Sequence, residues 1–356
     1  MSKLVLVQVL RALAALSVAM LHAQHDAATL AERTGRAFAP VEAFPWKAGV
    51  DVFFVISGFI MVHASARLFG AEGAGRTFLA RRIARIVPIY WAVTTLYLAV
   101  ALAVPEFLNR EFLDWSYVAA SYLFIPVTRP DGLVQPLYGL GWTLNYEMFF
   151  YALFAAAVAW PRKRAVPALA AVLVGLAAAG LLLRLAQPGP LPQPLGFWTD
   201  PIVLEFVYGM VLGYLHAEGV RLGPVPRALL SAGAVMILIA VASLWGVLAT
   251  PWRALAYGVP AAMLVAAVAL GRERRDEGRL ARIGAAVGDA SYALYLIHPF
   301  AIRAGREVVW RSGLAGIVGP WTFVVLALAA SVLAAVVVYR VFERPATAWV
   351  RARLGA

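Results

Sequence analysis

Five ionisable side chains stand within otherwise apolar stretches of this sequence: His22, Asp51, Glu147, Glu205 and His298. A charged group is costly in hydrocarbon, so each of these residues is a functional candidate. A neutral imidazole can take the proton of an attacking hydroxyl, and a carboxylate on its other nitrogen fixes its tautomer and orientation. These residue types favour acyl transfer by general base catalysis. From spacing alone, an interfacial histidine or a helix-packing hydrogen bond stays open as the alternative for each residue.

The first apolar stretch places several polar residues at helical spacing. Arg11 and His22 are eleven residues apart, and eleven steps of 100° return almost to the same direction, about 16 Å along a helix. His25 and Asp26 follow His22 at i+3 and i+4, so either residue would share its face if the helix continues. We therefore predict one polar stripe that connects the inner half of this helix to its outer end.

A basic segment at residues 76–85 carries Arg76, Arg81, Arg82 and Arg85. We predict that it is a loop on the inner side of a membrane. The planar guanidinium group suits phosphate because it can donate two parallel hydrogen bonds. A phosphorylated donor such as coenzyme A fits this segment, and so do anionic lipid headgroups.

The composition of the chain indicates which kind of secondary structure positions these residues. Of the 356 residues, 62% are hydrophobic and 14% are charged, which is too little polar surface for a soluble globule of this size. The apolar residues fall in stretches long enough to cross about 30 Å of hydrocarbon as helices. We therefore predict an all-α, polytopic membrane bundle of about ten spans. The predicted spans are 4–23, 48–65, 86–104, 141–160, 165–183, 200–218, 227–246, 251–270, 286–302 and 317–341.

The distribution of basic residues predicts the orientation. Residues 117–127 are too short to cross, so we expect them to form a re-entrant or interfacial element with the loop 126–140. With the amino terminus inside, the inner loops then hold about twice as many arginines and lysines as the outer loops, which predicts that both termini are cytoplasmic. Arg303, Arg306 and Arg311 run against this bias. In this topology the five ionisable residues named first lie in the outer part of the membrane, with Glu147 about 9 Å below the outer end of its helix.

Several other classes of function find no support. Arginines at cytoplasmic loops account for the net charge of +12, so we expect no nucleic-acid partner. The absence of cysteine excludes disulfides and an acyl-cysteine intermediate. No metal-ligand pattern is apparent, so we expect no metal and no permanently bound cofactor. Without an internal repeat, we expect one membrane domain over residues 1–356 and no soluble extension.

Six segments, in order along nearly the whole chain, resemble motifs of the membrane-bound acyltransferase 3 family of bacterial O-acyltransferases. The opening segment is most similar to the exopolysaccharide acetyltransferase branch. The matching segments are Arg11 through His22, Gly49 through Phe59, Arg81 through Trp91, Trp142 through Tyr151, Ser291 through Pro299, and Phe342 through Pro345.

The resemblance implies an activity and roles for residues. It implies a multi-pass protein of the bacterial inner membrane that takes an acyl group, with acetyl expected, from cytoplasmic acyl-CoA (acetyl-CoA) as co-substrate to a hydroxyl of a lipid-linked or exported saccharide. Membrane lipids and polysaccharide biosynthesis or export proteins are the further expected partners; no oligomeric state is predicted. The implied site comprises His22 as general base with Glu147, Asp51 and Arg11, donor-phosphate contacts from Arg81, Arg82 and Arg85, and substrate contacts from Asp26, His25, His298, Glu205 and Trp142.

Two other classes of function remain as alternatives. A glycan or lipid transporter would use the same polar layer as a path, although the missing repeat disfavours common transporter architectures. A structural subunit of a polysaccharide export complex would tolerate conservative changes at His22 and Glu147. Within the enzyme hypothesis, an acyl-histidine intermediate is a variant of direct transfer. The segment 161–285 resembles the family least, so acceptor choice is expected to reside there.

Overall fold

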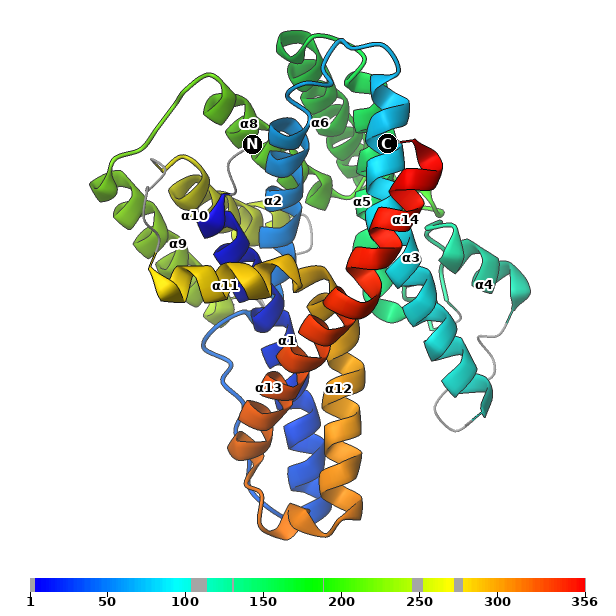
Figure 1. Cartoon of the computed structure of the whole chain (residues 1–356), viewed down its shortest axis with the longest axis vertical. Coiled ribbons are helices and arrows are strands. Elements are labelled where there is room, and N and C mark those ends of the chain that lie inside the picture. The colour runs from blue at the N-terminus through cyan, green and yellow to red at the C-terminus, as the bar shows by residue number, and fades with distance from the viewer. Residues whose placement is uncertain are drawn as a thin grey trace. The chain divides into compact units, whose positions relative to one another are not determined.

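The computed structural model describes residues 4–103, 114–129, 131–187, 189–244, 252–271 and 278–355. Within these ranges the chain is helical, and its only β contacts are the isolated bridges Thr128–Val134 and Leu222–Gly271. The all-α prediction is therefore confirmed for the described residues. The α-helices are α1 (Val5–Thr34), α2 (Gly49–Ala64), α3 (Ala74–Ala103), α4 (Trp115–Tyr122), α5 (Trp142–Ala157), α6 (Arg162–Ala186), α7 (Leu195–Trp198), α8 (Leu204–Ala217), α9 (Pro224–Leu244), α10 (Val259–Ala269), α11 (Arg279–Asp289), α12 (Ser291–Arg311), α13 (Pro320–Val338) and α14 (Arg344–Leu354) (Figure 1).

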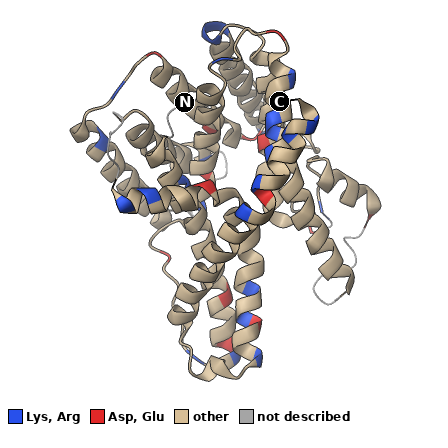
Figure 2. Ribbon diagram, in the orientation of Figure 1, with Lys and Arg blue, Asp and Glu red and all other residues tan. Residues whose placement is uncertain are grey.

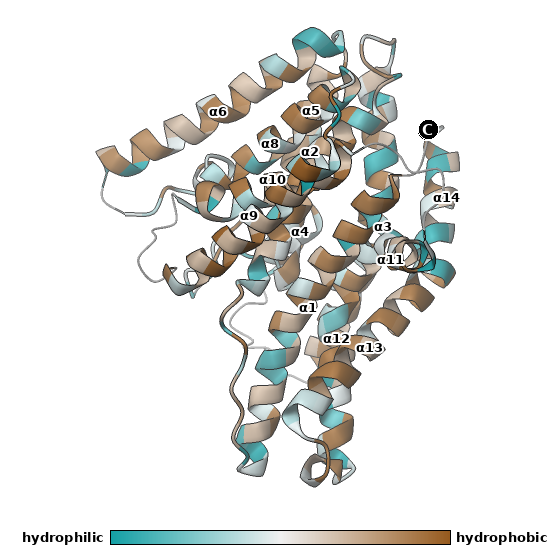
Figure 3. Ribbon diagram, turned by 90° about the vertical axis from the view of Figure 1, so that its left-hand side faces the viewer, coloured by the Kyte–Doolittle hydropathy of each residue, from teal (hydrophilic) through white to brown (hydrophobic). Residues whose placement is uncertain are grey.

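Among the described residues, six helices are long and apolar enough to cross a membrane. Hydrophobic residues predominate along such helices, as α9 and α13 show in Figure 3. Further predicted spans correspond to shorter helices, α5, α8 and α10, or to the more polar α12. The structure therefore supports a polytopic membrane protein, while the count of about ten spans and the cytoplasmic termini stay predictions. The predicted span ends at 104, 245–246 and 251 lie outside the described residues.

Two predicted assignments were wrong. The basic segment 76–85 is not a loop, because α3 begins at Ala74; the residues between its arginines carry a helical apolar pattern that charge alone obscured. The predicted span 286–302 joins parts of two helices, α11 and α12, which are separated at Ala290. The predicted span 317–341 overlaps Pro320–Leu354, one of the six helices long and apolar enough to cross a membrane, in which α13 is followed by a π-helical turn, Tyr339–Glu343. By contrast, the segment 117–127 is confirmed as too short to cross, since α4 has only eight residues.

The helices form two compact units. Unit 1 comprises residues 1–56, 219–249 and 255–342, and unit 2 comprises residues 57–218, 250–254 and 343–356. The prediction of a single membrane domain stays a prediction. Unit 1 thus contains α1 and α9 to α13, and unit 2 contains α3 to α8 and α14; α2 contributes to both.

In unit 1, α1, α12 and α13 pack side by side (Figure 1). The buried face of α1 is a stripe of small residues, Ala19, Ala23, Ala27 and Ala31, at intervals of four. Small side chains let membrane helices approach closely. Ala23 and Ala27 belong to one apolar cluster with Ile302 of α12 and Phe323 of α13. This packing brings the polar residues of α1 against α12.

The length of α1 carries it beyond the predicted span. Its 30 residues extend about 45 Å at 1.5 Å per residue, against about 30 Å of hydrocarbon. The helix ends at Gly35, whose φ of 65° is left-handed and whose N–H bonds back to Ala31 O, a C-terminal cap that favours glycine. Arg36 then donates hydrogen bonds to the carbonyls of Val318 and Gly316. These contacts tie the end of α1 to the segment before α13.

Candidate active site

The structure brings His22 of α1 and His298 of α12 together. Their ring centroids lie 5.1 Å apart with an interplanar angle of 50°. His298 is fully buried, and its Nδ1 lies 3.0 Å from the carbonyl oxygen of Leu294. His22 is half-buried. Two residues that are 276 positions apart in the chain thus form one imidazole pair within unit 1.

The hydrogen bond to Leu294 determines the tautomer of His298. A carbonyl oxygen only accepts, so Nδ1 of the neutral ring must carry the proton and Nε2 must carry the lone pair. Nε2 is buried and has no hydrogen-bond partner among the described residues. Pro299 follows directly and cannot donate the usual helical bond to Tyr295. In the ring beside His22, Nε2 of His298 is therefore buried, carries a lone pair and accepts no hydrogen bond from the described residues.

Asp26 and His25 lie one turn beyond His22, and the helix continues through both. The Asp26 carboxylate accepts a hydrogen bond from Arg306 Nη1 at 2.7 Å, and both side chains are largely buried. His25 is on the exposed face. Asp26 is thus committed to an ion pair with α12. The predicted substrate contacts of Asp26 and His25 stay predictions.

A network of charges surrounds this ion pair at the end of α12, where Figure 2 shows charged residues gathered on α12 and the adjoining part of α1. Arg306 Nη2 also forms an ion pair with Glu307 Oε1 at 3.2 Å. The same carboxylate oxygen lies 3.3 Å from Nη1 of Arg33 in α1. These contacts give a structural reason for basic residues that run against the predicted charge bias. For Arg306, the position is explained by its ion pairs with Asp26 and Glu307.

Asp51 and Arg11 also belong to unit 1. Asp51 is fully buried in the first turn of α2, where a carboxylate interacts favourably with the helix dipole. A Cβ at Gly49 would lie 2.4 Å from Ala14 O, so only glycine allows this approach of α2 to the middle of α1. Arg11 Nη1 donates to Gln8 Oε1 at 3.1 Å. The packing therefore places the start of α2, two residues before Asp51, against the helix that carries Arg11 and His22.

Unit 2 contains Glu147 and the three arginines of α3. Glu147 of α5 accepts a hydrogen bond from Tyr151 Oη at 2.7 Å, one turn along the same helix. A Cβ at Gly75 would lie 2.5 Å from Ala155 O, so α3 begins in close contact with α5. Arg81, Arg82 and Arg85 follow in α3, and Arg82 lies over the Phe78 ring at 5.5 Å. Nε of Arg81 and Nε of Arg82 are buried without a hydrogen-bond partner among the described residues.

Glu205 and Trp142 also lie in unit 2. Glu205 is fully buried in the first turn of α8, and Trp142 begins α5 with Arg253 5.9 Å from its ring centroid. Since Glu147, Glu205 and Trp142 belong to a different unit from the histidine pair, the predicted convergence of all five ionisable residues stays a prediction.

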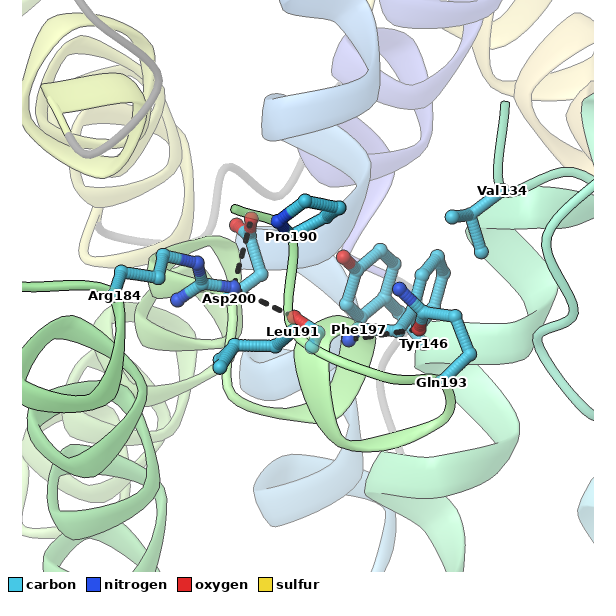
Figure 4. Close-up of a pocket in the computed structure, with 9 residues that line it drawn as sticks. Val134, Tyr146, Arg184, Pro190, Leu191, Gln193, Phe197 and Asp200 are labelled. Atoms are coloured by element: carbon cyan, nitrogen blue, oxygen red, sulfur yellow. Dashed lines mark hydrogen bonds and ion pairs between the residues drawn. The ribbon is translucent and has the colours of Figure 1, made fainter. Parts of the chain in front are cut away.

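A cavity of about 310 Å³ opens in unit 2 beside the end of α6 and the turn containing α7 (Figure 4). Arg184 of α6 donates to Gly196 O at 2.6 Å and lies 4.0 Å from the carboxylate of Asp200. This cavity was not predicted from the sequence. The one local feature that could have indicated it is Arg184, a charged residue in an apolar segment. The lining residues are Val134, Tyr146, Arg184, Pro190, Leu191, Gln193, Gly196, Phe197 and Asp200.

A second histidine pair was also missed. His63 near the end of α2 and His216 near the end of α8 have ring centroids 5.2 Å apart, and both rings contact Phe59. No spacing rule links these two residues, since α2 and α8 are distant in sequence. A Cβ at Gly58 would lie 2.2 Å from Phe206 O, so a close crossing of α2 and α8 brings them together.

Comparisons with known proteins agree with this arrangement of motifs. A family model described as an acyltransferase domain matches residues 6–340. The chain is 36% identical over 326 residues to the exopolysaccharide production protein ExoZ of Rhizobium meliloti (strain 1021), a match that covers 91% of this chain and 95% of that protein. No solved structure gives a significant match.

Proposed function

The chain belongs to the acyltransferase 3 family, and from that premise we propose that it transfers an acyl group from cytoplasmic acyl-CoA to a hydroxyl of an exported or cell-surface saccharide. Acetyl is the proposed acyl group, and the bacterial inner membrane is the proposed location. The saccharide class is supported by the name of the relative, which concerns exopolysaccharide production. The apolar helices support a membrane enzyme.

The observation that carries the mechanism is the contact between His22 and His298. His22 takes the proton of the acceptor hydroxyl, and the oxygen attacks the carbonyl carbon of the thioester. The carbon–sulfur bond breaks, and the CoA thiolate leaves with the proton returned by His22. The products are an O-acyl ester and free CoA, so each atom and proton is accounted for.

His298 supports this step through its orientation. Nδ1–H of His298 donates to Leu294 O, so Nε2 carries the lone pair. This nitrogen belongs to the ring that packs against His22. When His22 becomes an imidazolium ion, a neighbouring lone pair stabilises the new charge more than it stabilises the neutral ring. An interaction that is stronger in the transition state than in the ground state increases the rate.

Arg81, Arg82 and Arg85 are the proposed contacts for the donor phosphates. The buried Nε–H groups of Arg81 and Arg82 lack hydrogen-bond partners among the described residues, and a buried donor without a partner is costly. Phosphate oxygens would satisfy these donors. Anionic lipid headgroups share this chemistry, so donor titration is needed to separate the two.

The test is release of free CoA by the purified protein in nanodiscs, supplied with acetyl-CoA and a panel of glycans. Wild type should release CoA when glycan is present, and His22→Ala should lose about 10²-fold or more of kcat. Leu21→Ala is the matched control: it shortens an exposed side chain next to His22 on the same helix and should keep kcat. An unaltered rate in His22→Ala would overturn the assignment, and an acetyl group trapped on His22 would indicate an acyl-histidine intermediate. Glycan movement without donor consumption would indicate a transporter.

A further inference from the structure

The cavity beside α6 and α7 contains polar groups that can still form hydrogen bonds. Arg184 Nη2 and Asp200 Oδ2 are 4.0 Å apart, which is beyond hydrogen-bond distance. One hydroxyl between them could accept from the guanidinium and donate to the carboxylate. Gln193 uses Oε1 to accept the N–H of Phe197 at 3.1 Å, and its Nε2 donates no hydrogen bond within the described part of the chain. The cavity therefore offers donors and an acceptor side by side (Figure 4).

The charges in this cavity favour a neutral ligand. Among the described residues that line it, only Arg184 and Asp200 have ionised side chains, and their charges cancel. An anion such as phosphate would gain from the arginine and lose from the nearby carboxylate. Alternating donors and acceptors without net charge suit hydroxyl groups, each of which donates one hydrogen bond and accepts others.

The remaining wall is largely apolar and aromatic. Tyr146 and Phe197 stack on each other with ring centroids 3.7 Å apart and an angle of 16°, and Leu191 and Pro190 complete the wall. Small-ligand sites combine an apolar lining with a few placed polar groups, and this cavity lies at the lower end of their usual range of about 300–1,000 Å³. A sugar ring has the matching chemistry, since C–H groups cover its faces and hydroxyls its edge.

We infer that this cavity binds one neutral hexose residue of the acceptor saccharide; this assignment rests on the proposed function. Tyr146 in the wall directly precedes Glu147 of the candidate site in α5. The predicted topology puts the end of α6 that carries Arg184 at the outer face, where an exported saccharide would arrive. The cavity also lies where acceptor choice is expected, because 161–285 is the segment least similar to the family motifs.

Two substitutions remove ligand chemistry while keeping local structure. Asp200 caps the following turn by accepting from Ile202 N at 3.0 Å, and Asn in its place keeps an N-capping oxygen but loses the charge. Gln193→Glu keeps the acceptor for the N–H of Phe197 and loses the Nε2 donors. Val134→Phe fills the cavity from its rim. Leu133→Phe is its matched control, because Leu133 is the exposed neighbour and is not in the lining.

The experiment measures binding and kinetics separately with the full chain in nanodiscs. Saturation-transfer NMR reports binding of neutral glucose tetrasaccharides, α-linked and β-linked, with a uronic-acid tetrasaccharide as the anionic comparison. CoA release reports KM for acceptor and for acetyl-CoA. We expect a neutral tetrasaccharide to bind, and Asp200→Asn and Val134→Phe to raise acceptor KM about tenfold or more, with the KM for acetyl-CoA unchanged. Leu133→Phe should match wild type.

The outcomes separate this inference from the proposed function. Transfer with unchanged acceptor KM in both Asp200→Asn and Val134→Phe would overturn the cavity assignment and leave the acyltransferase intact. A rise in the KM for acetyl-CoA alone would assign the cavity to the donor and also overturn it. Saccharide binding that is lost in these variants, without CoA release by wild type, would support the cavity and contradict the proposed function.

Discussion

Arg306 of α12 donates to the carboxylate of Asp26 of α1 across 2.7 Å, and both side chains are largely buried. This ion pair lies one helical turn beyond His22 and joins the two helices that carry the histidine pair. Taking Arg306 away would leave the Asp26 carboxylate uncompensated in the packed interface between α1 and α12.

Breaking this pair should destabilise the protein, and replacing both partners should restore stability. Arg306→Met alone should lower the free energy of unfolding by about 3–5 kcal/mol, because it leaves the buried Asp26 carboxylate without its partner. The double variant Asp26→Leu with Arg306→Met should recover most of that loss. Thermal unfolding in detergent measures both, and equal stability of single and double variants would show that the pair is not coupled.

Acid should weaken the Arg33–Glu307 contact between α1 and α12. Burial raises the pKa of the Glu307 carboxyl, but hydrogen bonds from Arg306 and Arg33 outweigh burial and hold the pKa below its ordinary value of 4.5. A carboxyl with a lowered pKa adds stability above the unfolded pKa, and this is lost as the pH falls through the folded pKa. Unfolding of wild type and Glu307→Gln between pH 7 and pH 3 should therefore converge at the acidic end, and parallel curves would contradict this.

The tautomer of His298 predicts an asymmetry between two substitutions. Asn can imitate Nδ1–H but has no group at the position of Nε2, whereas Gln places a polar atom near Nε2. His298→Asn should therefore lower kcat about 10²-fold or more, with KM for acetyl-CoA unchanged, and His298→Gln should retain more activity. Steady-state CoA release decides the order, and equal loss in both variants would indicate a role in packing.

Substitutions of Arg81 and Arg82 should change the KM for the acyl donor and leave the KM for the acceptor unchanged. Replacing both by Lys keeps the charge but removes the planar fork and the Nε–H donors, so KM for acetyl-CoA should rise about tenfold or more while acceptor KM stays constant. Unchanged donor KM would assign these arginines to lipid headgroups. Lipid composition of the nanodisc can then be varied to test that assignment.

The crossing of α2 and α8 should depend on Gly58. Alanine normally stabilises a helix relative to glycine, by up to about 1 kcal/mol, but a Cβ at Gly58 would meet Phe206 O at 2.2 Å. Gly58→Ala should therefore destabilise the protein by about 1–3 kcal/mol. Gly175→Ala in α6, with nothing near its Cβ position, should be neutral or stabilising. The two variants are compared by thermal unfolding, and equal midpoints would argue against the close crossing.

Periodicity and composition predicted much of the fold, because apolar stretches and their breaks are local properties. The helical stripe of Arg11 and His22, the helical segments of most spans and the short α4 all follow from local patterns. The start of α3 was wrong because four arginines outweighed an apolar pattern between them. The break at Ala290 was missed because the apolar window crossed from α11 into α12.

The candidate site was predictable in its residues but not in its contacts. Ionisable side chains in apolar stretches identified His22 and His298, yet their proximity depends on the alanine stripe that lets α12 approach α1. Asp26 was expected near His22 from i+4 spacing, while its partner Arg306 is 280 residues away. The cavity at Arg184 depends on a turn whose geometry no periodic pattern specifies.

The continuation of α1 to Thr34 bears on the proposed transfer to a bulky saccharide. The histidine pair lies only one turn, about 6 Å, from a charged zone shared with α12, in the half of the helix predicted to face the exterior. A long hydrated polymer could therefore present a single hydroxyl at the surface and keep the rest of its length in water. Such an enzyme would acylate sugar units at any position along a long polymer. The length of the polymer would not limit which sugar units reach the histidine pair.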